Sequence, residues 1–477
     1  MELLIVTLAL GLISFIIPRN NIKLFGLMGS LVSAGVAIFH LLNFDSTAPL
    51  TTLYENHTLP FGMTFHIGYD GLGLLMIMLT NLIIPIILLS NYNNSKTSES
   101  SLFHALVFLM QFGLLGVFSA EDGILFYIFW EFTLIPIFLI LYWFGNGTNK
   151  ILLKFFIYTL IGSLGMLLSF IALRTHATSF DYVDLVAAKL PAKKACWIMS
   201  GIMLAFAIKI PVFPFHTWQP DTYTSAPMSA TMLLSALMLK MALFGMIKWM
   251  LPLAPEGIAD LKWLVLILSV VGLLYAAVMC IRMNDIKRLF AYASISHLGL
   301  IAAGIMIFTK DALVGASVQI VNHSIIAVGL FLIAEILESR LNTRNMSEMQ
   351  GTATLAPKFG FWFAVIAFAS VSIPFTAGFI GEFTLLKELT DFNPWIGILS
   401  STTLVFGAVY TLRAYQLSMF GAPKNEIFED LRWNEIAVFF ILSIAVVVFG
   451  LFPHLISDLV GPSLDRILAI FNAPTSL

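Results

Sequence analysis

Four ionisable side chains lie well inside long apolar runs, where a charged group is costly. Glu131 follows L-F-Y-I-F-W, and Lys209 lies within A-F-A-I-K-I-P-V-F-P. Lys240 lies in M-L-L-S-A-L-M-L-K-M, and Glu382 lies in T-A-G-F-I-G-E-F. A charge at the centre of a membrane helix costs about 2.5–3.5 kcal/mol on insertion scales, so such groups are typically functional and paired. We interpret the four as groups that hold and release protons.

Two histidines also lie inside predicted helices. His323 is part of Asn322-His323-Ser324, which interrupts the helix-length run 312–337, and His297 lies in Y-A-S-I-S-H-L-G. Histidine changes charge near neutral pH, which suits it to proton transfer. The predicted relay has Glu131 as the counter-charge of Lys209, Lys240 as the next group, His323 as the shuttle and Glu382 as the terminal group. The candidate path or gating residues are His216, His297 and Lys287.

Each assignment has a structural alternative. A buried pair such as Glu131 and Lys209 can simply fix how helices pack. A lone histidine in a helix, such as His297, is often a hydrogen-bonded core residue. His216 can cap a loop, and Lys287 can anchor a helix end at the membrane interface.

Prolines predict that two membrane helices are broken. Pro211 and Pro214 follow Lys209, and a proline inside a helix frees the carbonyl four residues back. Pro374 interrupts the run 358–388, which is too long for one unbroken span. We predict breaks near 207–214 and 370–382. Unpaired backbone groups at membrane depth are tolerated only beside protein or water, so each break indicates a polar surrounding.

The remaining sequence predicts the helices that position these groups. Hydrophobic residues make up 59% of the 477 residues and charged residues only 11%, against about 25% in soluble domains. A spanning helix needs about 20 mostly apolar residues. Strand-like ten-residue alternation is absent, which argues against a β-barrel. The sequence predicts an all-α polytopic membrane protein, one domain over 1–477, with about fourteen spans: 2–18, 23–43, 70–91, 102–119, 122–145, 151–174, 195–214, 227–251, 259–281, 286–308, 312–337, 358–388, 393–420 and 433–458.

The two broken runs, 207–214 and 370–378, are similar and lie five predicted helices apart. An odd offset gives opposite orientations, as in transporters built from inverted repeats. We predict one repeat over about 102–251 and a second over about 259–420, with 1–91 and 433–477 as flanking helices. Lysine and arginine are more frequent on one set of loops, which places both termini on the outer side.

Other features limit the function. A net charge of -2 argues against a nucleic-acid partner. The two cysteines have no Cys or His at ligand spacing, so no disulfide framework or metal site is predicted. No phosphate-binding loop, haem pair or iron–sulfur spacing occurs, so we expect no redox cofactor in this chain. Asp70 reads as a helix N-cap, residues 44–69 as a loop, and residues 182–190 as a short helix within a second loop. We read the N-terminus as a retained helix.

An ordered set of motifs between about 120 and 385 resembles the antiporter-like membrane subunits of respiratory complex I, which are related to multi-component cation/proton antiporters. The motifs are F-W-E, A-I-K-I-P-V-F-P-F-H-T-W-Q-P-D, A-P-M-S-A, L-M-L-K-M, N-D-I-K-R-L-F-A-Y-A-S-I-S-H-L-G and G-F-I-G-E-F. The chain is most similar to the chain-M branch of bacterial NADH–quinone oxidoreductase, the counterpart of mitochondrial chain 4. Glu382, where sister subunits carry lysine, and residues 337–346 carry that likeness.

The resemblance implies fourteen helices with two inverted five-helix repeats, and proton translocation driven by quinone reduction elsewhere. It implies that NADH, FMN, iron–sulfur clusters and quinone lie on partner subunits. It also implies sister antiporter-like subunits and the lipid bilayer as partners, and a bacterial inner membrane as location. Tyr223 replaces a histidine of the family pattern, which puts the usual proton uptake route in doubt. The alternatives are a cation/proton antiporter subunit without a redox partner and a passive scaffold.

Overall fold

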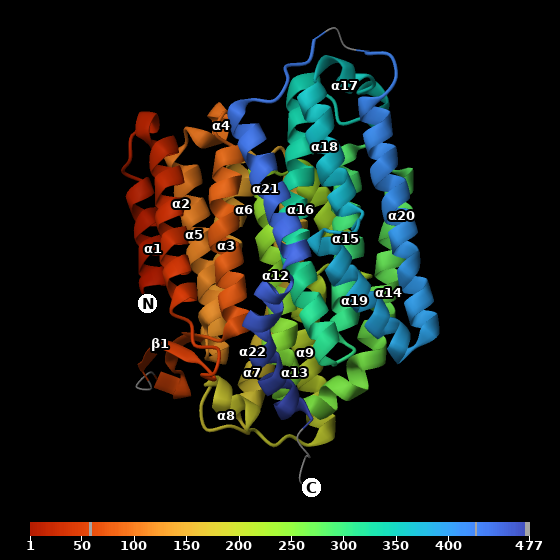
Figure 1. Ribbon diagram of the computed structural model, residues 1–477. Helices are drawn as coiled ribbons and strands as arrows, with labels where there is room; N and C mark the ends of the chain where they lie inside the picture. Colours follow the sequence, from red (N-terminus) through yellow and green to blue (C-terminus); the bar gives the residue numbers. More distant parts are fainter. Residues whose placement is uncertain (57–59, 425–426, 473–477) are drawn as a thin grey trace.

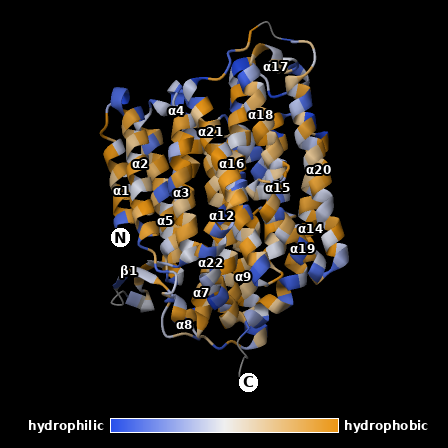
Figure 2. Cartoon of the chain, in the orientation of Figure 1, coloured by the Kyte–Doolittle hydropathy of each residue, from blue (hydrophilic) through white to orange (hydrophobic). Residues whose placement is uncertain are grey.

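The computed structural model describes residues 1–56, 60–424 and 427–472. Its helices form a single bundle in which most run along a common direction (Figure 1). Apolar residues dominate nearly every long helix in the hydropathy colouring (Figure 2). Because lipid offers no hydrogen bonds, backbone groups must be paired within the chain, and the helix satisfies this requirement locally. The predicted all-α membrane fold is therefore confirmed.

Among the described residues, eleven helices are long and apolar enough to cross a membrane. Three shorter or broken elements complete the fourteen predicted spans: α1, the pair α9 and α10, and the pair α18 and α19. The eleven long helices are α2 (Arg19–Leu42), α3 (Gly71–Ser90), α5 (Ser101–Ser119), α6 (Gly123–Phe144), α7 (Asn149–Arg174), the helix Met228–Leu253, α14 (Pro255–Arg282), α15 (Ile286–Ile305), α16 (Lys310–Leu341), α20 (Pro394–Met419) and α21 (Trp433–Leu451).

The last predicted span, 433–458, is wrong at its end. α21 ends at Leu451, and Pro453 precedes a separate helix, α22 (His454–Phe471). Proline lacks the amide donor that would continue the helix. The end of the predicted flanking segment, 473–477, lies outside the described residues. The other short elements are α1 (Glu2–Ser14), α4 (Ser95–Ser98), α8 (Tyr182–Val186), α17 (Thr352–Leu355), η1 (Pro60–Gly62) and η5 (Met346–Glu348).

At the first helix break, nearby residues of the chain donate hydrogen bonds to backbone carbonyls at the end of the helix. α9 (Ala192–Lys209) ends at the lysine, and a short turn, η2 (Phe215–Thr217), leads into α10 (Trp218–Ser225). The carbonyl of Ala207, freed by Pro211, accepts a hydrogen bond from the Val212 amide at 2.8 Å. The indole of Trp218 donates to the carbonyl of Ile208 at 2.9 Å. Protein groups therefore pair these two carbonyls at the break.

The second broken helix consists of α18 (Pro357–Ser370) and α19 (Ala377–Phe392). Ser372 and Phe375 between them have left-handed backbone angles, with φ of 59° and 73°. Gly450 of α21 lies against this turn, and a Cβ there would lie 2.4 Å from the Phe375 carbonyl oxygen. α9 and α18 reach the middle of the bundle from opposite ends (Figure 1). Both predicted breaks are present.

The helix Met228–Leu253 is completely buried and contains two π-helical turns. Its parts are α11 (Met228–Leu233), η3 (Leu234–Met238), α12 (Leu239–Gly245), η4 (Met246–Met250) and α13 (Leu251–Leu253). π-Helical turns are rare in proteins, and those that do occur are often found at functional sites. Lys240 follows the first turn, and Lys248 lies within the second.

A β-hairpin occupies part of the predicted loop 44–69, so that prediction is wrong in part. β1 (Thr51–Asn56) pairs antiparallel with β2 (Phe65–Tyr69), and Thr51 faces Tyr69. Both segments are rich in β-branched and aromatic residues, which suit a half-buried strand. We call the end of the bundle that carries this hairpin the hairpin side; the N-terminus and α22 lie toward it (Figure 1). The predicted helix 182–190 is shorter, ending at Val186.

Candidate functional site: a buried chain of ionisable groups

Lys240 and His323 form the centre of the site. Lys240 is fully buried, and its Nζ donates to the Ser235 carbonyl at 2.5 Å and lies 2.7 Å from His323 Nδ1. The other ring nitrogen, Nε2, lies 3.0 Å from the hydroxyl of Ser294. An ammonium at Lys240 therefore donates to an imidazole whose second nitrogen is free to donate to the serine. A proton can move along this line without large motion of the helices.

Glu382 lies at the other end of the same chain of contacts. Its Oε1 is 2.8 Å from His297 Nδ1 and accepts from Gln319 Nε2 at 2.9 Å. The rings of His297 and His323 have centroids 6.1 Å apart. The structure therefore brings Lys240, His323 and Glu382 together, and it places His297 between the last two. Sequence reasoning had proposed His297 only as a path or gating residue.

A small cavity separates the two histidines. It measures about 20 Å³ and is bordered by Ser294, His297 and His323 together with apolar side chains. A cavity of at least 10–15 Å³ with polar partners is large enough for roughly one water molecule. No described hydrogen bond joins the two imidazoles directly, and one water bound in this cavity would bridge them.

Gly381 makes the close approach of α19 to α16 feasible. A Cβ at this position would lie 2.7 Å from Gln319 Oε1 and 3.0 Å from the Gln319 backbone nitrogen. Asn322 donates to the same Gln319 oxygen at 3.3 Å. The polar run around His323 thus orients the amide that holds Glu382.

Lys209 and Glu131 form a separate group. Lys209 is 2% exposed, and its Nζ lies 5.6 Å from the centroid of the Trp130 ring, a cation–π contact. Glu131 is partly buried and lies close enough to Lys209 and Ser163 to interact with both. The described carboxylate and ammonium do not form a direct ion pair within 4.0 Å. The two predicted partners therefore interact electrostatically without a direct ion pair.

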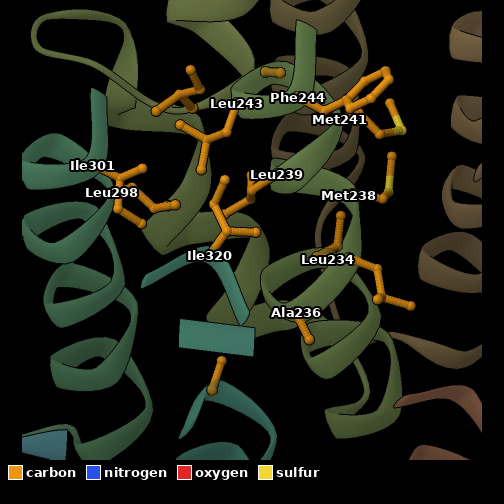
Figure 3. Packing of buried hydrophobic residues seen from close by; sticks show 14 of the residues in the cluster. Leu234, Ala236, Met238, Leu239, Met241, Leu243, Phe244, Leu298, Ile301 and Ile320 are labelled. Atoms are coloured by element: carbon orange, nitrogen blue, oxygen red, sulfur yellow. The ribbon is translucent and has the colours of Figure 1, made fainter. Parts of the chain in front are cut away.

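Apolar side chains separate this pair from Lys240. Phe206 of α9 packs so tightly on Gly245 of α12 that a Cβ there would lie 2.5 Å from the ring. The Trp130 ring lies beside the same phenylalanine, with the ring centroids 5.7 Å apart and the ring planes tilted by 44°. Figure 3 shows the buried apolar residues around α12, including Leu239, Met241 and Phe244. No described hydrogen bond or ion pair links Lys209 to Lys240.

The other predicted residues are also buried. His216 stacks on Phe213, with centroids 5.6 Å apart, and its Nδ1 has no hydrogen-bond partner among the described residues. Lys287 is 3% exposed and donates to the Ala226 carbonyl at 2.7 Å. It borders a polar cavity of about 440 Å³ at the end opposite the hairpin side, together with Glu335. Tyr223 is completely buried.

Sequence reasoning missed a buried triad near the hairpin side. Lys248 Nζ lies 3.0 Å from both Asp70 Oδ2 and Glu121 Oε1, and all three residues are at most 6% exposed. Lys248 also lies 4.6 Å from the Tyr182 ring. Asp70 does cap α3 as predicted, since it accepts from the Gly73 amide at 2.9 Å. Burial raises the pKa of Glu121, and Lys248 offsets this only in part.

A signal for the triad was present in the sequence. Lys248 lies within the predicted span 227–251, eight residues after Lys240, but it was not counted among the ionisable groups well inside the apolar runs. Beside the triad, His66 Nδ1 lies 2.7 Å from Asp181 Oδ2. Glu55, His66 and Asp181 offer ligand atoms within 4.8 Å of one another, a grouping that can suit a metal ion. The sequence predicted no metal site, and Asp181 lies far along the chain from the other two residues.

The chain is similar to several known proteins over most of its length. The profile of a family described as "NADH:quinone oxidoreductase/Mrp antiporter, TM" matches residues 120–407. The chain is 30% identical to NADH-quinone oxidoreductase subunit M of Rhodobacter capsulatus, covering 95% of this chain and 92% of that one. It is 32% identical to NADH-ubiquinone oxidoreductase chain 4 of Metridium senile, covering 96% of both chains. A chain in the structure of respiratory complex I from Thermus thermophilus with bound NADH is 28% identical, with a TM-score of 0.91 and 99% of both chains covered.

Proposed function

The chain belongs to the NADH:quinone oxidoreductase/Mrp antiporter family of membrane subunits, and we propose that it translocates protons as a membrane subunit of an NADH–quinone oxidoreductase. Protons move through buried Glu, Lys and His side chains, and quinone reduction elsewhere in the complex drives them. Two relatives that match over nine tenths of their length are named as subunits of such an oxidoreductase.

The observation that carries the proposal is the buried line from Lys240 through His323 and His297 to Glu382. Its direct contacts are 2.7 Å and 2.8 Å long, and only the interval between the two rings needs a water. Ionisable groups in a membrane domain are rare, face the interior of the bundle and form proton relays. A passive scaffold would not need a lysine and a glutamate joined by two imidazoles at this depth.

Glu131 acts on this line through Lys209. When Glu131 is ionised and close, it stabilises the proton on Lys209; when the carboxylate moves away or is neutralised, burial favours the release of that proton. Because these two described groups interact without a direct ion pair, the arrangement suits such control better than a locked ion pair would. Lys287, His216 and the polar cavity opposite the hairpin side border the uptake route.

We place NADH, FMN, iron–sulfur clusters and quinone on partner subunits, with sister antiporter-like subunits beside this chain. The protein spans the membrane many times. We assign it to the bacterial inner membrane with both termini on the outer side, following the excess of lysine and arginine on the opposite loops. The inverted repeats are assigned to about 102–251 and 259–420.

The test is Glu131→Gln in the assembled complex, reconstituted in vesicles, with Glu429→Gln as the control. Glu429 is exposed and, among the described residues, forms an ion pair with Arg432. We expect normal assembly and a large loss of NADH-driven proton uptake for the first variant, and no change for the control. Normal assembly with normal uptake would remove Glu131 from the relay. Proton uptake driven by a sodium gradient without NADH would support cation/proton exchange instead.

A further inference from the structure

The hairpin side carries a further group of polar side chains, Glu55, His66 and Asp181, which lies apart from the buried relay. Glu55 of β1 faces His66 of β2 in the antiparallel ladder, so both side chains leave the hairpin on the same face. Asp181 caps α8 by accepting from the Val183 amide at 3.0 Å, and α8 lies at the same end of the bundle as β1 (Figure 1). One carboxylate oxygen of each acid and one nitrogen of the histidine lie within 4.8 Å of one another. Two paired strands and a distant loop therefore bring together three side chains of the kinds that bind metal ions.

The backbone holds this grouping in place. The Glu121 amide donates to the His66 carbonyl at 3.0 Å, and the Tyr182 amide donates to the Glu121 carbonyl at 2.8 Å. β2 and the start of α8 are thus both fixed to the loop between α5 and α6. Asp181 Oδ2 lies 2.7 Å from His66 Nδ1, which orients the ring. A site that is already ordered loses little conformational entropy when a ligand binds.

Burial differs among the three residues in a way that suits an ion arriving from solvent. His66 is 7% exposed and Asp181 is 8% exposed, whereas Glu55 is an exposed residue of the hairpin. An ion would therefore meet the Glu55 carboxylate first and be held against two buried groups.

The ring of His66 has a nitrogen to spare. A neutral imidazole carries one hydrogen, and the carboxylate of Asp181 favours that hydrogen on Nδ1. Nε2 then carries a lone pair, and this atom is buried without a hydrogen-bond partner among the described residues. A buried polar atom without a partner is uncommon and calls for an explanation such as a bound ion. This observation is independent of the spacing of the three side chains, and it points to a cation.

The ligand types indicate which cation fits. Two ionised carboxylates and a neutral imidazole together carry two negative charges, which a divalent cation balances. Imidazole nitrogen and carboxylate oxygen are both zinc ligands, and three protein ligands with a water form the open type of zinc site. Calcium takes about six to eight oxygen ligands, which this set does not provide. Ligand atoms of a tetrahedral zinc site are roughly 3.3 Å apart, so side-chain rotations are enough to reach it from the present spacing.

We propose that Glu55, His66 and Asp181 bind one divalent cation of the zinc class on the hairpin side, with water completing its coordination. The histidine contributes a ring nitrogen, and each acid contributes one carboxylate oxygen. The ion joins β1 to β2 and to the loop before α8, so it clamps the hairpin against the bundle. This inference goes beyond proton translocation and does not depend on it.

The test measures zinc binding by the whole complex after a chelator has removed loosely bound metal. Equilibrium dialysis with radioactive zinc counts the ions, and X-ray absorption at the zinc edge identifies their ligands whatever iron the partner subunits carry. The variants are Glu55→Gln, His66→Gln and Asp181→Asn, and the control is Asp465→Asn. Asp465 is an exposed acid that pairs with Lys310.

We expect the unmodified complex and the control to bind one zinc ion more than each variant, because any zinc on partner subunits is common to all samples. Changing a residue that only supports a metal ligand costs about 10–100-fold in affinity, so loss of a ligand should weaken binding by at least ~100-fold. Zinc should also slow amide exchange in β1 and β2 of the unmodified complex and have no such effect in the variants.

Equal zinc binding by the unmodified complex and the Glu55→Gln variant overturns the proposal. That variant decides alone if the other two do not assemble, because Glu55 is exposed and its replacement keeps the buried contact between His66 and Asp181. Displacement of the zinc by an equal concentration of calcium overturns the assignment to the zinc class. Normal zinc binding in a Glu131→Gln complex that has lost proton uptake supports the site, and normal uptake in that complex leaves it standing, so the two proposals fail separately.

Discussion

Replacing His323 by leucine and by alanine separates a proton relay from mere packing. Among the described hydrogen bonds, the only side chain that pairs with Lys240 Nζ is His323, at 2.7 Å; the other partner is the backbone carbonyl of Ser235. The next histidine of the proposed relay is His297, whose ring centroid lies 6.1 Å from that of His323. A hydrogen bond spans about 2.7–3.2 Å, so no single bond can replace the histidine.

The two substitutions leave different spaces. Leucine fills most of the imidazole volume with apolar atoms, so the interval stays dry. Alanine opens a void that merges with the cavity of about 20 Å³ beside Ser294, and Lys240 and Ser294 give water its polar partners. A positioned proton-transfer group contributes about 10²–10⁴-fold to rate, which is about 2.7–5.5 kcal/mol of barrier. We expect His323→Leu to lose this full factor and His323→Ala to lose only about ten-fold, since bridging water replaces a direct contact.

The assay is NADH-driven proton uptake in vesicles, normalised to the amount of assembled complex. His454→Leu is the control, because His454 is an exposed histidine at the start of α22. An assembled His323→Leu variant that pumps normally would refute the relay. Leucine and alanine variants with equal residual uptake would refute the role given to water.

Three further results are expected. Gly381→Leu should lower the melting temperature of the complex through overpacking of about 1–3 kcal/mol, whereas Gly35→Ala should not, because its Cβ would meet nothing within 4 Å; equal effects would contradict the close packing of α19. Trp218→Phe should destabilise the subunit by about 1–3 kcal/mol in denaturant melts, because it leaves the Ile208 carbonyl unpaired; an unchanged midpoint would show that the break needs no such donor. Burial lowers the pKa of His66, but its hydrogen-bonded carboxylate partner and neighbouring acids outweigh burial and raise that pKa above 6.5. Stabilisation of the hairpin should therefore be complete below pH 6.5 and decline as pH rises through the raised pKa, seen as faster amide exchange relative to His66→Gln; parallel pH profiles would contradict this.

The fold was largely predictable from the sequence because membrane helices have a strong local signal. Runs of apolar residues defined the spans, and Pro211 and Pro374 marked the two breaks. The hairpin was not predicted, since its strands are short and lie in a polar loop, where tertiary contacts decide the structure. α22 was missed because Pro453 lies inside an apolar run and the run was read as one helix.

The site was predictable where a charge interrupts an apolar run. Lys240, His323 and Glu382 stood out in this way, and the structure brings them together. Their geometry was not predictable, because the approach of α19 to α16 depends on Gly381 and on the orientation of an amide. Lys248 also lies within a predicted span, but close to its end, where a lysine can reach the membrane surface, so it did not stand out as a buried charge. Its partners, from distant loops, have no sequence pattern that links them.

The aromatic contact between Phe206 and Gly245 has a consequence for energy conservation. A continuous line of hydrogen bonds from one side of the membrane to the other would let the electrochemical gradient discharge through the protein itself. In the proposed relay, Trp130 and Phe206 would keep the Lys209 group apart from Lys240, so that protons pass only while a rearrangement admits water beside the two rings. A smaller side chain at 206 would convert this pump into a leak.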